Sequence, residues 1–263
     1  MTGNKKRLRN FFSIRAIAPN VVTVLAFCMG LTAVRFALAD KWELAVAAII
    51  VAGVFDGLDG TVARLLRSTS KFGAELDSLS DVVAFGVVPA LVIYLWALES
   101  LDRLGWAAAL IYAVAMALRL ARFNSRMDLD DENDTRKQMG FLTGVPAPMG
   151  AGLMVAPMVL DFGYTGTLMK DHPYFLAIYT IVVALLMIST LPTFTLKAVR
   201  VPRNSFVPVL LFVAIFFATL FVFPWTALLL IAIFYVASMP VCWIAYKKRS
   251  KELSDAPTGA DAE

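Results

Sequence analysis

Charged residues are scarce in this chain of 263 residues. Asp, Glu, Lys and Arg together make up 17%, whereas apolar residues make up 59% and the mean hydropathy is +0.73. Globular chains carry roughly 25% charged and about 45–50% apolar residues. A soluble fold of this composition lacks the polar side chains needed to cover its surface, so lipid must be the solvent for much of the protein. The composition excludes a soluble nucleic-acid-binding protein and a disordered chain.

Cysteine is almost absent as well. The two cysteines, Cys28 and Cys242, lie in apolar segments far apart in the sequence. Two such residues exclude a disulfide-rich secreted scaffold, and their separation does not match the spacing of metal ligands. We therefore predict that both are small core residues.

Long apolar runs are abundant, and a helix that crosses the hydrocarbon core needs about 20 such residues. The sequence predicts an all-α integral membrane protein with about eight transmembrane helices in one transmembrane domain over 20–246. A basic amphipathic segment, 1–19, precedes this domain, and a tail at 247–263, predicted to be disordered, follows it. The eight predicted spans are 20–39, 43–64, 74–98, 104–123, 144–162, 173–192, 205–223 and 225–246.

The positions of the basic residues test this arrangement independently. If the N-terminus is cytoplasmic and all eight spans are real, 20 of the 24 Lys and Arg residues fall on the cytoplasmic side. Only Arg35, Lys41, Arg103 and Lys170 fall toward the other side. This bias follows the positive-inside rule, so we predict cytoplasmic N- and C-termini. The basic pI of about 9.1 then reflects orientation and attraction to anionic lipid, and not nucleic-acid binding.

Four aspartates interrupt the apolar pattern at the junction of the second and third predicted spans. Asp56 and Asp59 are spaced i,i+3 and Asp77 and Asp81 are spaced i,i+4, so each pair shares one helix face. At a rise of about 1.5 Å per residue, all four lie roughly 6–12 Å inside the cytoplasmic edge. Apolar helical sequence encloses both pairs, which disfavours a solvated loop. We predict that the four carboxylates face one another just inside the cytoplasmic leaflet.

Converging carboxylates in a membrane repel one another, and a divalent cation removes that repulsion. A set of oxygen ligands without His or Cys suits Mg²⁺, Mn²⁺ or Ca²⁺ rather than Zn²⁺. Mg²⁺ in particular binds few protein carboxylates together with substrate phosphates. Gly57, Gly60 and Gly73 leave room for close approach of a ligand, and Arg64 can neutralise phosphate oxygens. The sequence therefore predicts a divalent-metal site that holds a phosphate ligand.

The same residues resemble the signature of the CDP-alcohol phosphotransferases. The pattern Asp56-x2-Asp59-Gly60-x2-Ala63-Arg64-x8-Gly73-x3-Asp77-x3-Asp81 matches that signature at every position. Within the family the flanking sequence, over about residues 15–155, is similar to the bacterial CDP-diacylglycerol–serine O-phosphatidyltransferases. Ser80 and Ala84 depart mildly from that pattern. The resemblance implies the family's six-helix core, a bacterial cytoplasmic membrane enzyme and a homodimer.

The resemblance also implies roles for individual residues. Asp56, Asp59 and Asp77 correspond to metal ligands, and Asp81 is shared between the metal and general-base catalysis on the acceptor hydroxyl. The implied substrates are CDP-diacylglycerol and L-serine, and the implied products are phosphatidylserine and CMP. The family positions that contact the cytidine nucleotide correspond to Asn20, Thr23, Gly60, Arg64 and Ser70.

The binding site for the acceptor is less fully specified. Arg119 and Arg122 share a face at the cytoplasmic end of the fourth predicted span, where a guanidinium suits a carboxylate or a lipid phosphate. Arginines at span ends are commonly topology anchors, and that interpretation stays open for both. Arg35 is expected to snorkel to the opposite interface. His172 is the single histidine and is expected in a loop, so chemistry based on paired His-x-Lys motifs is excluded.

Two alternative functions stay open. Within the family, glycerol 3-phosphate, inositol phosphate or another alcohol can replace serine as the acceptor, although a phosphorylated acceptor calls for more basic residues near the site. Outside the family, an ion-coupled secondary transporter can also use intramembrane aspartates. Transporters usually contain internal repeats, and no paired-Asp motif recurs in the last four predicted spans. Release of CMP from CDP-diacylglycerol distinguishes an enzyme from a transporter or a non-catalytic scaffold.

Overall fold

The computed structural model describes residues 14–66, 68, 70–128, 141–189, 192–194, 211, 214–215 and 218–254. Most of these residues are helical, as the composition predicts. The longer helices in chain order are α1 (Ile14–Ala37), α2 (Trp42–Leu66), α3 (Lys71–Asp81), α4 (Val88–Trp96), α5 (Arg103–Asp128), α7 (Ala147–Leu160), α8 (Pro173–Ile188) and α10 (Pro224–Ser254).

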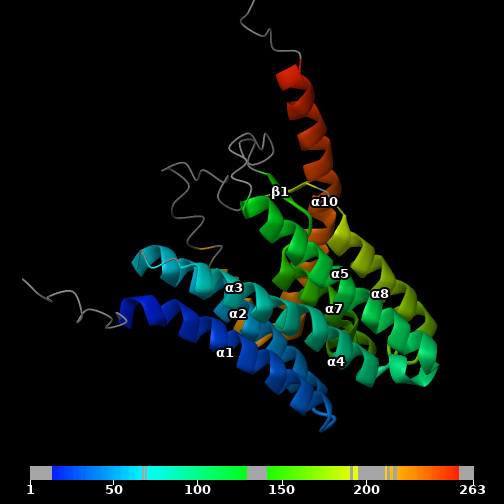
Figure 1. Cartoon of the computed structure of the whole chain (residues 1–263). Helices are drawn as coiled ribbons and strands as arrows, with labels where there is room; N and C mark the ends of the chain where they lie inside the picture. The colour runs from blue at the N-terminus through cyan, green and yellow to red at the C-terminus, as the bar shows by residue number, and fades with distance from the viewer. Residues whose placement is uncertain are drawn as a thin grey trace, which may run out of the picture.

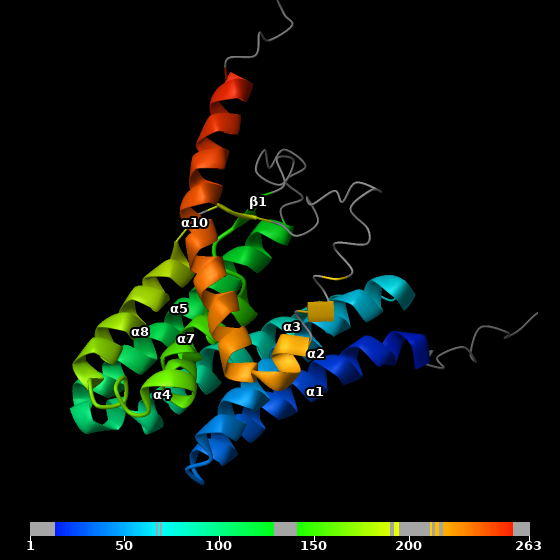
Figure 2. The same cartoon turned by 180° about the vertical axis from the view of Figure 1, so that it is seen from behind.

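Two packed groups of helices make up the described part of the chain. Helices α1 and α2 lie side by side as an antiparallel pair, and α5 packs along α8 (Figures 1 and 2). Helix α7 contacts α2, α8 and α10, so it joins the two groups at the centre. The core between them is apolar and includes Phe85, Tyr112 and Met154, each almost fully buried.

The third predicted span is a continuous helical segment with a change of pitch inside it. Helix α3 passes into a π-helical turn, η1 (Val82–Val87), which leads directly into α4. A π-turn leaves backbone groups out of the regular hydrogen-bond ladder. The buried hydroxyl of Tyr112 on α5 donates a hydrogen bond to the carbonyl oxygen of Phe85 at 2.9 Å and so ties α5 to this turn. The π-turn begins at the residue after Asp81 and is thus part of the scaffold beneath that side chain.

The predicted spans agree with the observed helices in most places. Five described segments are long and apolar enough to cross a membrane: Ile17–Ala37, Trp42–Leu66, Lys71–Trp96, Arg103–Ser125 and Pro224–Ile244. The sixth predicted span corresponds to α8, a shorter apolar helix. The fifth corresponds to α7 followed by a second π-turn, η3 (Asp161–Thr165), with Pro157 inside the helix. The all-α class is confirmed.

Other predictions about the ends of the chain are tested only in part. The amphipathic segment 1–19 lies mostly outside the described residues, and so does most of the seventh predicted span, 205–223. Helix α10 runs through Ser254, so it enters the segment 247–263 that the sequence predicts as a disordered tail.

The prediction that both cysteines are core residues is correct for Cys242, which is buried. It is wrong for Cys28, whose side chain is exposed on α1.

A short strand pair lies outside the helices and was not predicted. Strand β1 (Phe141–Thr143) pairs antiparallel with β2 (Pro192–Phe194), and Leu142 is opposite Thr193. The pair joins the segment before α7 to the segment after α8, and β2 also contacts α10. Gly144, directly after β1, has φ +81, a left-handed conformation that glycine adopts without strain.

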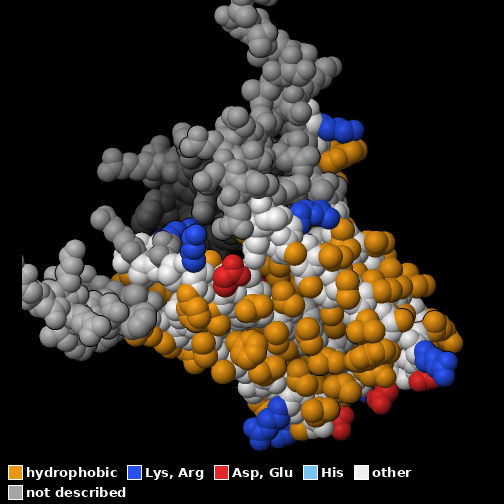
Figure 3. Space-filling view, viewed as in Figure 1, with side chains coloured by type: hydrophobic (Ala, Val, Ile, Leu, Met, Phe, Trp, Pro, Cys, Tyr) orange, Lys and Arg blue, Asp and Glu red, His pale blue; other side chains and the backbone are white. Residues whose placement is uncertain are grey.

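The molecular surface fits a lipid environment. Figure 3 shows apolar side chains covering a broad band of one face, with charged side chains gathered along its borders. Large apolar side chains are well exposed on these helices, such as Val114 and Leu118 on α5 and Ile178 and Leu185 on α8. Such an area greatly exceeds the apolar patches of soluble monomers, so these helices face acyl chains.

Candidate active site

Three aspartates converge between α2 and α3. One carboxylate oxygen from each of Asp56, Asp59 and Asp77 lies within 4.8 Å of the others, a spacing that allows one cation to contact all three. Asp59 is 6% exposed, and the other two are half-buried. Of the four carboxylates predicted to face one another, these three converge.

Asp81 lies beside this group and is not one of its three converging members. Its side chain interacts directly with that of Asp56, and the side chain of Asp77 interacts directly with that of Asp59. One oxygen of Asp77, Oδ1, is buried and has no hydrogen-bond partner among the described residues. A buried carboxylate oxygen without a donor is costly unless a cation or ligand completes its surroundings.

Helix α1 supports the acids through hydrogen bonds at Thr23. The buried hydroxyl of Thr23 donates a hydrogen bond of 2.8 Å to Oδ2 of Asp59. The hydroxyl of Ser80, which is buried on α3, donates to the carbonyl oxygen of Thr23 at 3.4 Å. Because one residue of α1 contacts both acid-bearing helices, Thr23 fixes their relative position as well as the orientation of Asp59.

A second cluster of predicted site residues forms at the N-terminus of α3. Ser70 caps this helix, since its hydroxyl accepts a hydrogen bond of 3.0 Å from the backbone N–H of Gly73. A Cβ atom at Gly73 would lie 2.9 Å from Oδ1 of Asn20 and 3.1 Å from Oγ of Ser70. A side chain at position 73 would therefore displace the side chains of Asn20 and Ser70 from this junction. Asn20, Thr23 and Ser70, predicted nucleotide contacts, lie along one junction.

The remaining predicted nucleotide contacts lie on the open side of α2. A Cβ atom at Gly57 or Gly60 would meet nothing within 4 Å, so the backbone beside the acids is accessible. The side chain of Arg64 is exposed and folds back along its own helix, where Nε donates to the carbonyl oxygen of Gly60 at 3.0 Å. That hydrogen bond is on an exposed surface, and Arg64 can exchange it for a phosphate oxygen.

The two arginines of α5 have different surroundings. Arg122 donates a hydrogen bond of 2.9 Å from its guanidinium to the carbonyl oxygen of Ile188, the last residue of α8. Arg119 makes no hydrogen bond with the described residues, and its buried Nε has no partner. Its guanidinium instead interacts electrostatically with Asp81 and Asp56. Of the two candidates, Arg119 is the one directed toward the acids.

Sequence reasoning missed two other polar residues near this region. Asn124 of α5 donates from Nδ2 to the hydroxyl of Ser78 at 2.9 Å, which ties α5 to α3 beside Asp77. Tyr235 of α10 has a buried hydroxyl without a hydrogen-bond partner in the described structure, and it interacts electrostatically with Arg119. Asn124 belongs to a polar tract that the sequence displays, whereas Tyr235 lies within an apolar run that gives no such signal.

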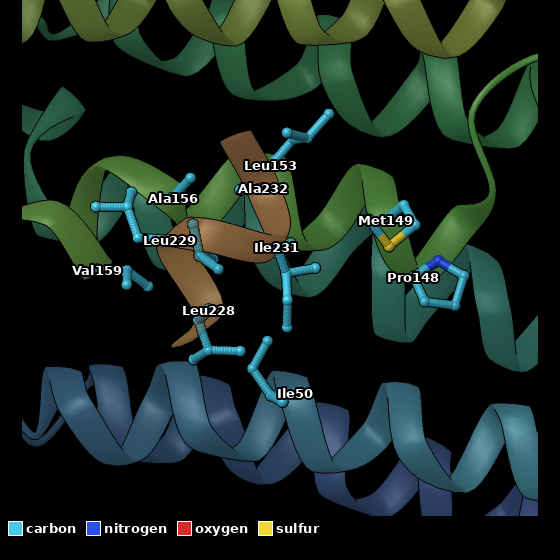
Figure 4. A pocket seen from close by; sticks show the side chains of 12 residues that line it. Ile50, Pro148, Met149, Leu153, Ala156, Val159, Leu228, Leu229, Ile231 and Ala232 are labelled. Atoms are coloured by element: carbon cyan, nitrogen blue, oxygen red, sulfur yellow. The ribbon is translucent and has the colours of Figure 1, made fainter. Parts of the chain in front are cut away.

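A cavity of about 90 Å³ between α2, α7 and α10 is not part of the polar site. The side chains that line it are apolar, among them Ile50, Met149, Leu153 and Leu228 (Figure 4). A cavity of this chemistry cannot satisfy a phosphate or a zwitterionic alcohol.

The donor set of the acid cluster fits a hard divalent cation. All the converging ligand atoms are carboxylate oxygens, the type that Mg²⁺, Mn²⁺ and Ca²⁺ prefer. The unpartnered Oδ1 of Asp77 and the open backbone at Gly57 and Gly60 leave a lone pair and space for a cation with its phosphate ligand. The arrangement can bind a diphosphate and hold a carboxylate, Asp81, beside it.

Two family models match this chain. The model for CDP-alcohol phosphatidyltransferase covers residues 16–169, and the model for CDP-alcohol phosphatidyltransferase 2 covers residues 204–240. The first match contains α1 to α7 and all four aspartates. The second contains the part of α10 that carries Tyr235.

Named relatives resemble the chain over most of its length. The chain is 39% identical to the CDP-diacylglycerol–serine O-phosphatidyltransferase of Mycobacterium bovis over 224 residues, which cover 85% of this chain and 77% of that protein. The protein of the same name from Helicobacter pylori is 33% identical over 199 residues, covering 76% and 81%. That of Methanocaldococcus jannaschii is 41% identical over 146 residues, covering 55% and 62%.

Proposed function

The chain belongs to the CDP-alcohol phosphatidyltransferase family, and we propose that it transfers the phosphatidyl group of CDP-diacylglycerol to the hydroxyl of L-serine. The products are phosphatidylserine and CMP, so the protein is a transferase of phospholipid biosynthesis. The observation that carries this proposal is the convergence of Asp56, Asp59 and Asp77 within 4.8 Å in a multi-pass membrane protein. The names of the relatives support serine as the acceptor.

Metal dependence follows from the donor set. We propose that Asp56, Asp59 and Asp77, with Asp81 shared, hold Mg²⁺ or Mn²⁺, and Ca²⁺ also fits oxygen ligands. When bound, the ion neutralises charge on the diphosphate oxygens and on the departing CMP. The hydrogen bond from Thr23 keeps Asp59 oriented toward the other acids, and Gly57 and Gly60 leave the diphosphate a path to them.

Asp81 is proposed as the general base. It takes the proton from the seryl hydroxyl while the seryl oxygen forms a bond to the phosphatidyl phosphorus. The bond from that phosphorus to the bridging oxygen breaks, and CMP leaves with the electron pair. A carboxylate is a weak base for an alcohol, so positioning of the two substrates must supply much of the acceleration. The position of Asp81 beside the three-acid group, in contact with Asp56, supports this role.

The nucleotide is proposed to lie along the junction of α1 and α3. Asn20, Thr23 and Ser70 gather there, and Gly60 and Arg64 border the same opening on α2. Arg64 is free to release its bond to Gly60 and pair with a phosphate oxygen of CDP-diacylglycerol.

The surroundings of the arginines favour an acceptor with a single anionic group. Arg119 is directed toward the acids, whereas Arg122 is engaged with the end of α8. A phosphorylated acceptor, such as glycerol 3-phosphate or inositol phosphate, needs more cations than this at its binding site. Serine brings a single carboxylate, which one guanidinium can pair with.

The cellular setting is also a proposal. The distribution of Lys and Arg supports cytoplasmic termini and an active site at the cytoplasmic face of a bacterial inner membrane. The lipid substrate then enters from the bilayer, and serine and CMP exchange with the cytosol. A homodimer is expected from the resemblance described above.

The experiment is a panel of acceptors with purified protein in detergent. CDP-diacylglycerol and Mn²⁺ or Mg²⁺ are supplied with L-serine, glycerol 3-phosphate or inositol phosphate, and CMP and lipid products are measured. We expect phosphatidylserine and CMP in equal amounts with serine. A different preferred alcohol contradicts the acceptor, and an absence of CMP release with every alcohol contradicts the transferase and leaves the transporter.

A further inference from the structure

We propose that Arg119 and Tyr235 together form the pocket for the carboxylate of the acceptor and so determine its specificity for an amino acid. This inference rests on the proposed function and adds Tyr235 of α10, a residue outside the four-aspartate motif. Nε of Arg119 and the hydroxyl of Tyr235 are both buried and have no hydrogen-bond partner among the described residues. Each interacts electrostatically with the other.

Two buried polar groups without partners are costly in a membrane protein. A guanidinium is only a donor, and a phenol can donate as well. Two unpartnered donors that lie near one another on different helices are therefore suited to an anion. The neighbouring arginine shows the contrast, because Arg122 is hydrogen-bonded to the carbonyl oxygen of Ile188.

The position of Arg119 beside the acids indicates which anion the pocket binds. Arg119 interacts with Asp81 and Asp56, and Asp81 is the proposed base for the acceptor hydroxyl. In L-serine only the β- and α-carbons separate the hydroxyl oxygen from the carboxylate. A serine with its hydroxyl at Asp81 therefore has its carboxylate nearby, on the side where Arg119 lies. The diphosphate of the lipid belongs with Asp56, Asp59 and Asp77 instead.

The contribution of α10 is what makes this pocket specific. The turn of α10 before Tyr235 places Leu228, Leu229 and Ala232 against the apolar cavity shared with α7 (Figure 4). Tyr235 follows these residues on the same helix, and its buried hydroxyl interacts electrostatically with Arg119. In a buried pocket a hydrogen bond to a carboxylate is strong, and a neutral group in its place offers the guanidinium no opposite charge.

The test compares acceptors that keep or lack the carboxylate, using full-length protein with CDP-diacylglycerol and Mn²⁺. The wild-type protein, Tyr235→Phe and Arg119→Lys are each assayed with L-serine and with L-serinamide, which keeps the hydroxyl and the amine. We expect Tyr235→Phe to raise KM for serine about tenfold, because it removes one hydrogen bond to a charged group. Its kcat and its KM for CDP-diacylglycerol should stay within about twofold, and its preference for serine over serinamide should fall.

Tyr174→Phe is the matched control, because this tyrosine is exposed at the start of α8 and lacks a role in the proposed pocket. The inference is overturned if Tyr235→Phe and Arg119→Lys both keep the wild-type KM for serine and its preference over serinamide. It is also overturned if the KM for CDP-diacylglycerol rises instead, since the donors then serve the lipid phosphate. In both cases phosphatidyl transfer to serine persists, so the proposed function stands. Should Tyr235→Phe fail to fold, the acceptor preference of Arg119→Lys still decides the question.

Discussion

Two regions of this molecule bury carboxylates within apolar helices, and they satisfy those carboxylates in opposite ways. At the end of α7, Asp161 is 3% exposed and accepts hydrogen bonds from the hydroxyl of Thr165 and from the backbone N–H groups of Met169 and Lys170. At the junction of α2 and α3, the carboxylates face one another, and Oδ1 of Asp77 has no partner among the described residues.

The presence or absence of hydrogen-bond donors from the protein distinguishes a structural acid, Asp161, from acids that we propose bind a ligand. The donors around Asp161 come from the loop that follows it, so its charge is balanced by the fold and organises that loop. The side chain of Lys170 in this loop lies 5.8 Å from the ring of Trp42, which places the loop beside the start of α2. Among the acids near the other end of α2, Asp59 accepts a hydrogen bond from Thr23, whereas Oδ1 of Asp77 has no donor among the described residues and fits the proposed cation. Burial of a carboxylate therefore indicates a functional site only when its oxygens lack donors from the protein itself.

We expect the largest loss of activity from a substitution in the acid cluster of α2 and α3. Asp77→Asn removes the charge whose oxygen is unpartnered, and we expect phosphatidyl transfer to fall to the background rate, because the metal site loses one of three carboxylates. CMP release with L-serine measures this loss. Glu43→Gln is the matched control, since Glu43 is an exposed acid on the first turn of α2 and should keep full activity. Activity of Asp77→Asn close to that of the control would mean that the cluster is structural.

Asp81→Asn tests whether Asp81 acts in catalysis separately from the binding of CDP-diacylglycerol. The amide cannot accept the seryl proton, so we expect turnover to fall by about 10²–10⁴-fold while CDP-diacylglycerol still binds. Equilibrium binding of the nucleotide lipid, measured beside CMP release, separates the two effects. Near wild-type turnover would remove Asp81 from the role of general base.

Asp161→Ala tests the other region and should affect stability instead of chemistry. The backbone N–H groups of Met169 and Lys170 lose their acceptor, and we expect a loss on the order of 3 kcal/mol in the free energy of unfolding. Thermal unfolding in detergent measures the loss, with Asp161→Asn as the milder variant because its amide oxygen still accepts. The KM values of the remaining folded enzyme should be unchanged. A selective loss of metal response in a stable Asp161 variant would contradict the comparison.

Tyr112→Phe tests the scaffold beneath the acids. Without the phenol, the carbonyl oxygen of Phe85 in the π-turn loses the donor that Tyr112 supplies, and we expect about 1–3 kcal/mol of lost stability. Since the π-turn follows Asp81 directly, turnover should fall with little change in the KM for either substrate. Unchanged stability and turnover would show that the π-turn does not depend on this hydrogen bond.

The smallest effect is expected at Lys170. Its cation lies 5.8 Å from the centre of the Trp42 ring on an exposed part of the molecule, so Lys170→Met should cost less than about 1 kcal/mol. Thermal unfolding beside Asp161→Ala compares the two contributions to the same loop. A loss as large as that of Asp161→Ala would mean that the charge of Lys170, and not the carboxylate, organises the loop.

Much of the fold and of the acid cluster follows from two features of the sequence, the length of its apolar runs and the helical spacing of its aspartates. Runs of apolar residues predict the helices, and the i,i+3 and i,i+4 spacings place Asp56 with Asp59 and Asp77 with Asp81. Other features depend on contacts between distant segments. Arg119 and Arg122 share a predicted face, yet the carbonyl oxygen of Ile188 at the end of α8 engages only Arg122.

Other features of the fold could not be predicted from the sequence pattern. Tyr235 is an aromatic residue in an apolar run, and only the packing of α10 brings it toward Arg119. The π-turn after Asp81 lies where helices pack closely: a Cβ atom on Gly30 would lie 3.0 Å from Cβ of Ala84, and one on Gly86 3.0 Å from Cβ of Met116. Asp161 did offer a signal, since it is a lone carboxylate at the end of an apolar span, but its donors become evident only in the folded loop.

The most direct test of the central claim is Mn²⁺ binding to the full-length protein in detergent, followed by electron paramagnetic resonance. The wild-type protein and Asp161→Asn should bind Mn²⁺ alike, and Asp77→Asn should lose most of that binding. Equal Mn²⁺ binding by Asp77→Asn and the wild-type protein would contradict the assignment of the acids of α2 and α3 as a metal site.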